Sequence, residues 1–172
     1  TALGLNLSYQ ISADKLLKIA VFDGTPDDYE NNPYNLNWQV SQEQGYLIVS
    51  EFQIHRSLIR NKGGTYKFGA YFHEHRDTID IEQKNGGIYF VADQHITNNL
   101  SFFSQLGISP KKLNKHNLFY SLGFNCKGIS VKRPDDVMGL AVAFAKIDNN
   151  IGSETSLELT YKLNLTNNLY LR

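Results

Sequence analysis

The fold class is decided by one stretch near the end of the sequence, Thr155-Ser156-Leu157-Glu158-Leu159-Thr160-Tyr161-Lys162-Leu163-Asn164-Leu165. Its odd-numbered positions from Leu157 to Leu165 are apolar or aromatic, and its even-numbered positions from Ser156 to Asn164 are polar. Successive side chains of a β-strand point to opposite faces. The stretch therefore predicts a strand with one apolar face and one polar face.

The same two-residue period recurs along the whole chain, and no window of comparable length shows the 3.6-residue period of a helix. Turn-forming residues separate the alternating runs, with short turns such as Ser12-Ala13-Asp14 and Thr97-Asn98 alternating with longer polar connections. We therefore predict an all-β antiparallel meander over residues 1–172, as a single domain. The predicted strands are 2–11, 15–23, 45–56, 64–74, 87–96, 99–108, 117–127, 137–147, 155–165 and 168–172.

Charge and motifs exclude several functional classes. The 172 residues carry 17 Lys and Arg against 17 Asp and Glu, so there is no basic excess to bind nucleic acid. The single cysteine, Cys126, allows neither an internal disulfide nor a multi-cysteine metal site. The sequence contains no nucleophile elbow, phosphate-binding loop or zinc-protease motif, so we predict neither an enzyme nor a cofactor.

The alternation by itself leaves two architectures open. In a soluble barrel or sandwich the apolar face would point inward and could bind a small ligand in an apolar cavity. In a transmembrane barrel the apolar face would contact lipid and the polar face would line the lumen. The predicted strands of about 9–11 residues match a tilted crossing of a bilayer, and aromatic residues are frequent near their ends. These features favour the transmembrane barrel.

Residues 86–172 carry motifs that resemble a known family. They contain Gly86-Gly87-Ile88-Tyr89-Phe90-Val91-Ala92-Asp93-Gln94, then Arg133-Pro134-Asp135-Asp136 with Gly139, and then Glu154 and Glu158 with Tyr161. This order resembles the C-terminal half of the OprB-type carbohydrate-selective porins, although Lys132 stands where the family pattern has Gly. Residues 1–85 fit the same architecture by their alternation, not by a motif.

The resemblance implies a 16-stranded barrel in the bacterial outer membrane through which sugars and ions diffuse passively. About ten strands are too few for such a barrel, so we expect the chain to be part of one, incomplete at both ends. A closed barrel of eight or ten strands is the alternative. The implied partners are carbohydrates as transported solutes and outer-membrane lipid, and the resemblance leaves monomer and homo-oligomer open.

A sugar channel needs aromatic surfaces for the apolar face of a pyranose ring and polar groups for its hydroxyls. The polar positions of the strands would line the lumen, and Gln53, Gln105 and Asn125 are among them. Trp38, in the connection 24–44, is either an inward-folded sugar platform or a packing residue. The candidate sugar-contacting residues are Glu51, His55, Lys67, His73, Asp93, His95, Glu158, Lys162 and Trp38.

Two further clusters have competing interpretations. His73 and His75 lie on one face of a predicted strand, but without a third ligand nearby we predict no metal site. With Asp77 they would also allow an outer-membrane enzyme with its active groups at the loop rim, our third hypothesis. Arg133 would pair with Asp135 or Asp136 in a structural turn.

Overall fold

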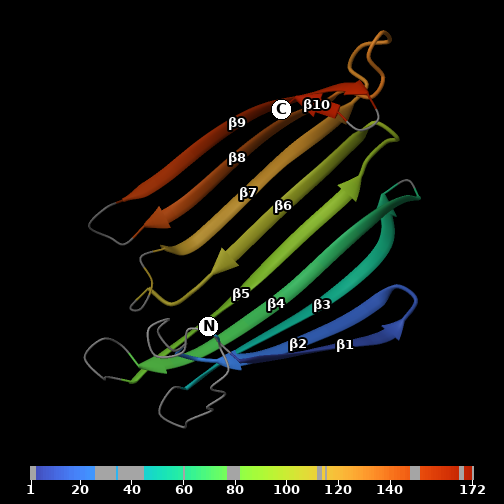
Figure 1. The fold of residues 1–172 in the computed structure, drawn as a ribbon. Coiled ribbons are helices and arrows are strands. Elements are labelled where there is room, and N and C mark those ends of the chain that lie inside the picture. Colours follow the sequence, from blue (N-terminus) through green and yellow to red (C-terminus); the bar gives the residue numbers. More distant parts are fainter. Residues whose placement is uncertain are drawn as a thin grey trace. The chain divides into compact units, whose positions relative to one another are not determined.

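The computed structural model describes residues 3–25, 34, 45–59, 61–76, 82–111, 114, 116–147, 152–166 and 169–171, without the side chains of 76, 82 and 166. These residues form ten strands that follow one another in chain order in an antiparallel meander (Figure 1). The strands are β1 (Gly4–Ser12), β2 (Lys15–Asp23), β3 (Tyr46–Ile59), β4 (Lys62–Arg76), β5 (Glu82–His95), β6 (Leu100–Ile108), β7 (His116–Lys127), β8 (Val137–Ile147), β9 (Ser153–Thr166) and β10 (Leu169–Leu171).

The predicted all-β meander is confirmed, with one strand for each predicted run. The largest difference is at β5, which begins at Glu82 and not at Gly87. The polar segment Glu82–Asn85 has no apolar alternation, so its sequence carries no strand signal even though it is part of the strand. None of the described residues belongs to a helix that could cross a membrane.

The chain divides into two compact units, residues 1–53 with 68–88 and residues 54–67 with 89–172. In the first unit, β1 pairs with β2 so that Leu5 faces Val21 and Leu7 faces Ile19. These four apolar side chains share one face, and Asn6 and Ser8 with their partners share the other. The sequence alternation of the two strands is thus in register across the pair.

In the second unit the register builds continuous rows across β6, β7, β8 and β9. One row on the apolar face runs through Phe102, Phe124, Leu140 and Leu159, each directly opposite the next. The row beside it, on the polar face, consists of Phe103, Gly123, Ala141 and Glu158. The apolar row is thus continuous across the four strands, whereas the row on the opposite face combines an aromatic, two small residues and a carboxylate.

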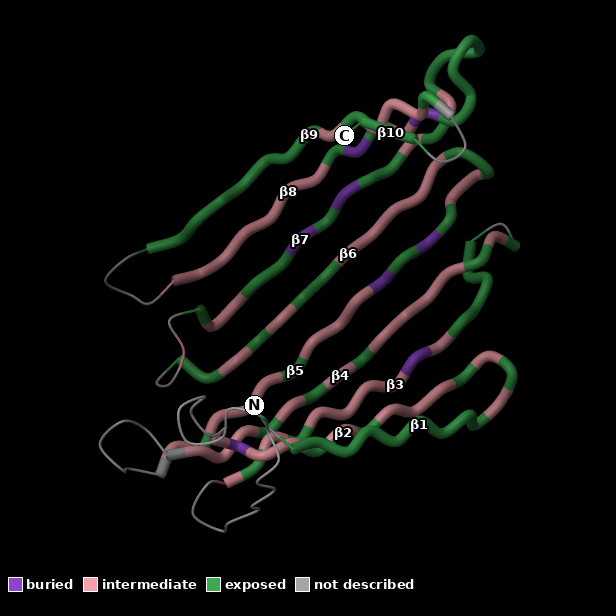
Figure 2. Tube along the Cα trace, in the orientation of Figure 1, coloured by how far each residue is buried: buried purple, intermediate pink, exposed green. Residues whose placement is uncertain are grey.

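The apolar face is not covered by a hydrophobic core. Leu157 is 75% exposed and Leu159 is 67% exposed, and in the first unit Leu5 is 73% exposed. Within the described residues, Ala92 is the one buried hydrophobic side chain. Figure 2 accordingly shows intermediate and exposed positions along most of the strands. An apolar surface of this extent is stable in hydrocarbon and unfavourable in water.

The two faces of β9 give a testable contrast at neighbouring positions. We expect Leu159→Arg to destabilise the protein in lipid vesicles, lowering its free energy of unfolding by about 2–4 kcal/mol, because a guanidinium would have to enter hydrocarbon at mid-strand. Glu158→Arg, on the polar face, is the matched control and should change the stability by no more than about 0.5 kcal/mol. Equal costs for the two variants, measured by urea unfolding in vesicles, would contradict the assignment of the faces.

Candidate functional site

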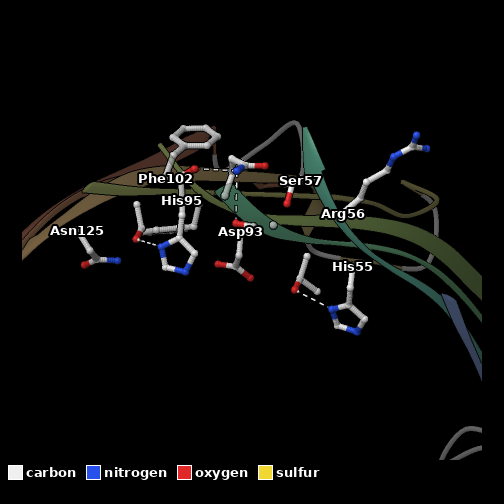
Figure 3. Close-up of a pocket in the computed structure, with 13 residues that line it drawn as sticks. His55, Arg56, Ser57, Asp93, His95, Phe102 and Asn125 are labelled. Atoms are coloured by element: carbon white, nitrogen blue, oxygen red, sulfur yellow. Dashed lines mark hydrogen bonds between the residues drawn. The ribbon is translucent and has the colours of Figure 1, made fainter. Parts of the chain in front are cut away.

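The polar face of the second unit contains a hollow of about 630 Å³ over β3, β4, β5, β6 and β7. In Figure 3 the side chains of His55, Asp93, His95 and Asn125 lie on the same side of the sheet, and Phe102 lies on the other side. His55 Nδ1 shares a hydrogen bond of 3.0 Å with the Thr65 hydroxyl. The hollow thus gathers imidazoles, a carboxylate and an amide on one surface.

His95 is oriented in the same way as His55. Its Nδ1 shares a hydrogen bond of 2.9 Å with the hydroxyl of Ser101 on β6. In both pairs one ring nitrogen is engaged by a hydroxyl of the adjacent strand, and this contact restrains the orientation of the imidazole. Two imidazoles restrained in this way can donate to or accept from a polar solute in the hollow.

A second hollow, of about 220 Å³, lies on the polar face over β6, β7, β8 and β9. Glu158 and Thr160 line it from β9, and Gly139 and Ala141 of β8 leave space for it because they have little or no side chain. Phe103 and Asn125 line this hollow as well as the first. The two hollows are therefore neighbours that share an aromatic ring and an amide.

The sequence-predicted site residues divide between the two units. His55, Asp93 and His95 line the first hollow, and Glu158 lines the second. Lys67 and Lys162 belong to the same unit, where the Lys162 ammonium lies 4.1 Å from the centre of the Tyr170 ring. Glu51 belongs to the other unit and accepts a hydrogen bond of 2.5 Å from Gln53. A contact of any of these residues with sugar remains a prediction.

His73 is also in the first unit, with His75. The two rings stack with centroids 4.3 Å apart, and His73 Nε2 is 2.8 Å from the Gly24 carbonyl oxygen. In the described part of the chain no cluster of three metal-ligating side chains is present. Asp77 and Trp38 lie outside the described residues, so the rim enzyme and the tryptophan platform are not tested by this structure.

The connection between β7 and β8 is attached to β9 through the carboxylate of Asp136, which is 2% exposed. This carboxylate accepts hydrogen bonds from Arg133 Nε at 2.6 Å, from the Tyr161 hydroxyl at 2.5 Å and from the backbone N–H of Asn164 at 2.9 Å. The hydrogen bond from Tyr161, with those from Asn164 and Arg133, lowers the pKa of Asp136 despite its burial. The predicted structural pairing of Arg133 is thus made with Asp136.

These features are those of a porin wall: a meander of long strands, an uncovered apolar face, and a polar face with shallow hollows. The family of carbohydrate-selective porins named OprB matches this chain over residues 1–172. The chain belongs to the OprB family. Membership of this family makes it an outer-membrane protein of a Gram-negative bacterium.

A solved OprB has the same fold. The high-pH structure of Pseudomonas putida OprB matches with a TM-score of 0.78 at 19% sequence identity. The match covers 92% of this chain and 49% of the Pseudomonas putida protein, so the chain spans about half the length of that OprB. A comparison with curated proteins found no match.

Phe103 was missed by reasoning from the sequence. The expected site residues are charged, imidazole or amide side chains on the polar face, together with Trp38, whereas Phe103 is a phenylalanine at a polar-face position. The sequence does indicate its face, because Ser101 and Gln105, two residues before and two residues after Phe103, point to the same face of the strand and are polar. Its position opposite Gly123 requires the register of β6 with β7.

The hydrogen bonds of Asp136 predict a stability effect at one end of the OprB sheet. Asp136→Asn should lower the temperature at which the folded protein unfolds in SDS, because an amide cannot accept from Arg133, Tyr161 and Asn164 together. Asp135→Asn is the matched control, since the side chain of Asp135 is 71% exposed and forms an ion pair with the exposed Lys127 at 3.0 Å. An equal shift for both variants, read from gel mobility after heating, would contradict this role.

The lowered pKa of Asp136 also fixes the pH range of this effect. A carboxylate whose pKa is lower in the folded state stabilises the fold above its unfolded pKa, which is about 3.9, and loses that contribution as the pH falls through the folded value. The difference in unfolding temperature between the native protein and Asp136→Asn should therefore be constant near neutral pH and shrink below about pH 4. A difference that grows on acidification would exclude this cause.

Proposed function

We propose that the protein is a passive channel of the outer membrane that prefers carbohydrates among small solutes. The observation that carries this proposal is the match of the OprB carbohydrate-selective porin family over all 172 residues. The two faces of the sheet support it, because an apolar face suited to lipid and a polar face suited to water are what a channel wall requires. The solutes are carbohydrates, and the apolar face contacts outer-membrane lipid.

The composition of the polar face supports carbohydrate as the solute class. The hollows combine carboxylates, imidazoles, amides and hydroxyls, which can replace water around sugar hydroxyls, with the Phe103 ring for the apolar face of a sugar. Both hollows are partly open to solvent, so we expect sugar to bind weakly. Weak binding is what passage requires, because a solute must leave as readily as it enters.

The soluble alternative, a barrel or sandwich with a ligand in an apolar cavity, is not favoured. The hollows described above are lined mainly by polar side chains and glycine, while the apolar side chains lie on the uncovered face. A homo-oligomeric state stays a prediction.

The proposal is tested by reconstituting the native protein, purified from its membrane, into planar bilayers and liposomes. We expect stepwise ion conductance, and swelling of liposomes that is faster in glucose or maltose than in a neutral solute of equal size such as a short polyethylene glycol. Heat-denatured protein is the control for detergent leakage. Absence of conductance steps would refute the channel, and equal swelling rates would refute its carbohydrate preference.

A further inference from the structure

Phe103 is an aromatic side chain on the polar face, where its neighbours along β6, Ser101 and Gln105, are polar. Directly opposite it on β7 is Gly123. A Cβ atom added to Gly123 would lie 2.6 Å from Cε1 and 2.8 Å from Cζ of the Phe103 ring. The ring therefore lies across the glycine, in space that any other residue at position 123 would fill.

A second phenylalanine on the same face shows that this arrangement is not a general consequence of the register. Phe119 is opposite Gly107 in the same strand pair, so the sequence pattern is repeated with the strands exchanged. A Cβ atom added to Gly107 would come no closer to Phe119 than 3.9 Å, and the atom met there is Cβ of Phe119, not its ring. In this strand pair the ring lies across its glycine partner at Phe103 and not at Phe119. The ring of Phe22 on β2 also lies across the glycine opposite it, Gly4, but Phe22 lines neither of the two hollows.

The position of Phe103 between the two hollows gives the ring polar groups on both sides. Asp93 and His95 are in the first hollow and Glu158 is in the second, while Asn125 lines both. Gly139 and Ala141 continue the low surface beyond Gly123. A ring lying along the wall with carboxylates on two sides suits a flat ligand that has an apolar face and a rim of hydroxyls.

We propose that Phe103 is the stacking platform of a pyranose-binding subsite, in which the Asp93 and Glu158 carboxylates accept hydrogen bonds from hydroxyls at the sugar rim and the Asn125 amide donates or accepts one. The C–H groups of one pyranose face pack on the aromatic ring, and carboxylates accept from hydroxyls. An acyclic polyol offers the same hydroxyls but no flat apolar face, so the subsite discriminates by ring shape. This inference rests on the proposed channel function and names the site that gives it its preference.

The test is single-channel recording of the native protein and of variants, with glucose or maltose as the probe and sorbitol as the acyclic comparison. Phe103→Leu should keep the ion conductance but raise the sugar concentration for half-maximal block by about two- to tenfold, the range expected for losing one aromatic contact. Phe103→Tyr, which keeps the ring, should retain the block of the native protein. Block by sorbitol should be weaker than block by glucose and unchanged in Phe103→Leu.

Phe119→Leu is the matched control, since it removes the same side chain from the same face away from the two hollows. Phe103→Met, which keeps side-chain length without a ring, replaces Phe103→Leu if that variant forms no channels. A conducting channel whose sugar block is unchanged in Phe103→Leu, or is weakened equally in Phe119→Leu, would overturn the subsite and leave the channel function intact. Absence of any conductance in the native protein would instead overturn the channel function, and the subsite with it.

Discussion

Each backbone N–H and C=O group of a membrane-spanning strand must be paired inside the protein, because hydrocarbon offers no hydrogen-bonding partner. A meander of adjacent antiparallel strands meets this requirement with connections that stay local in the sequence. The pairing also fixes register, and a slip by one residue would exchange the two faces of a strand. The apolar row through Phe102, Phe124, Leu140 and Leu159 therefore exists only because every pair in it is in register.

The same constraint explains where specific side-chain chemistry is concentrated. On the apolar face side chains need only be compatible with lipid, and their packing partners are interchangeable. Polar-face residues such as His55 and His95 instead contact hydroxyls of the adjacent strand, which orients them toward the hollow. At the end of the sheet, Asp136 has three donors and holds the connection after β7 against β9. The apolar face thus requires only side chains that are compatible with lipid, whereas the polar face and the end of the sheet contain side chains held by specific hydrogen bonds.

The strand pattern could be predicted from the sequence because period two is a local property, visible in any ten residues of β9 or β1. The boundaries were least certain at β5, where Glu82–Asn85 lacks apolar residues. The polar members of the candidate site could also be predicted, since parity assigns Asp93, His95 and Glu158 to one face. What parity could not give is which of them lie together, because that depends on the register between strands and on the division of the chain into two units. For the same reason the relation of Phe103 to Gly123 was not visible.

The close approach of the Phe103 ring to Gly123 makes the side chain allowed at one position depend on the residue at the other, twenty residues away in the sequence. Any side chain at position 123 would displace the Phe103 ring, and loss of the ring would leave the backbone at Gly123 uncovered. The backbone oxygen of Leu140 lies 2.5 Å from the same added Cβ, so a side chain at position 123 could not be accommodated by a shift toward β8 either. Position 103 accepts other side chains without a clash of this kind, whereas position 123 requires glycine for as long as this backbone is retained.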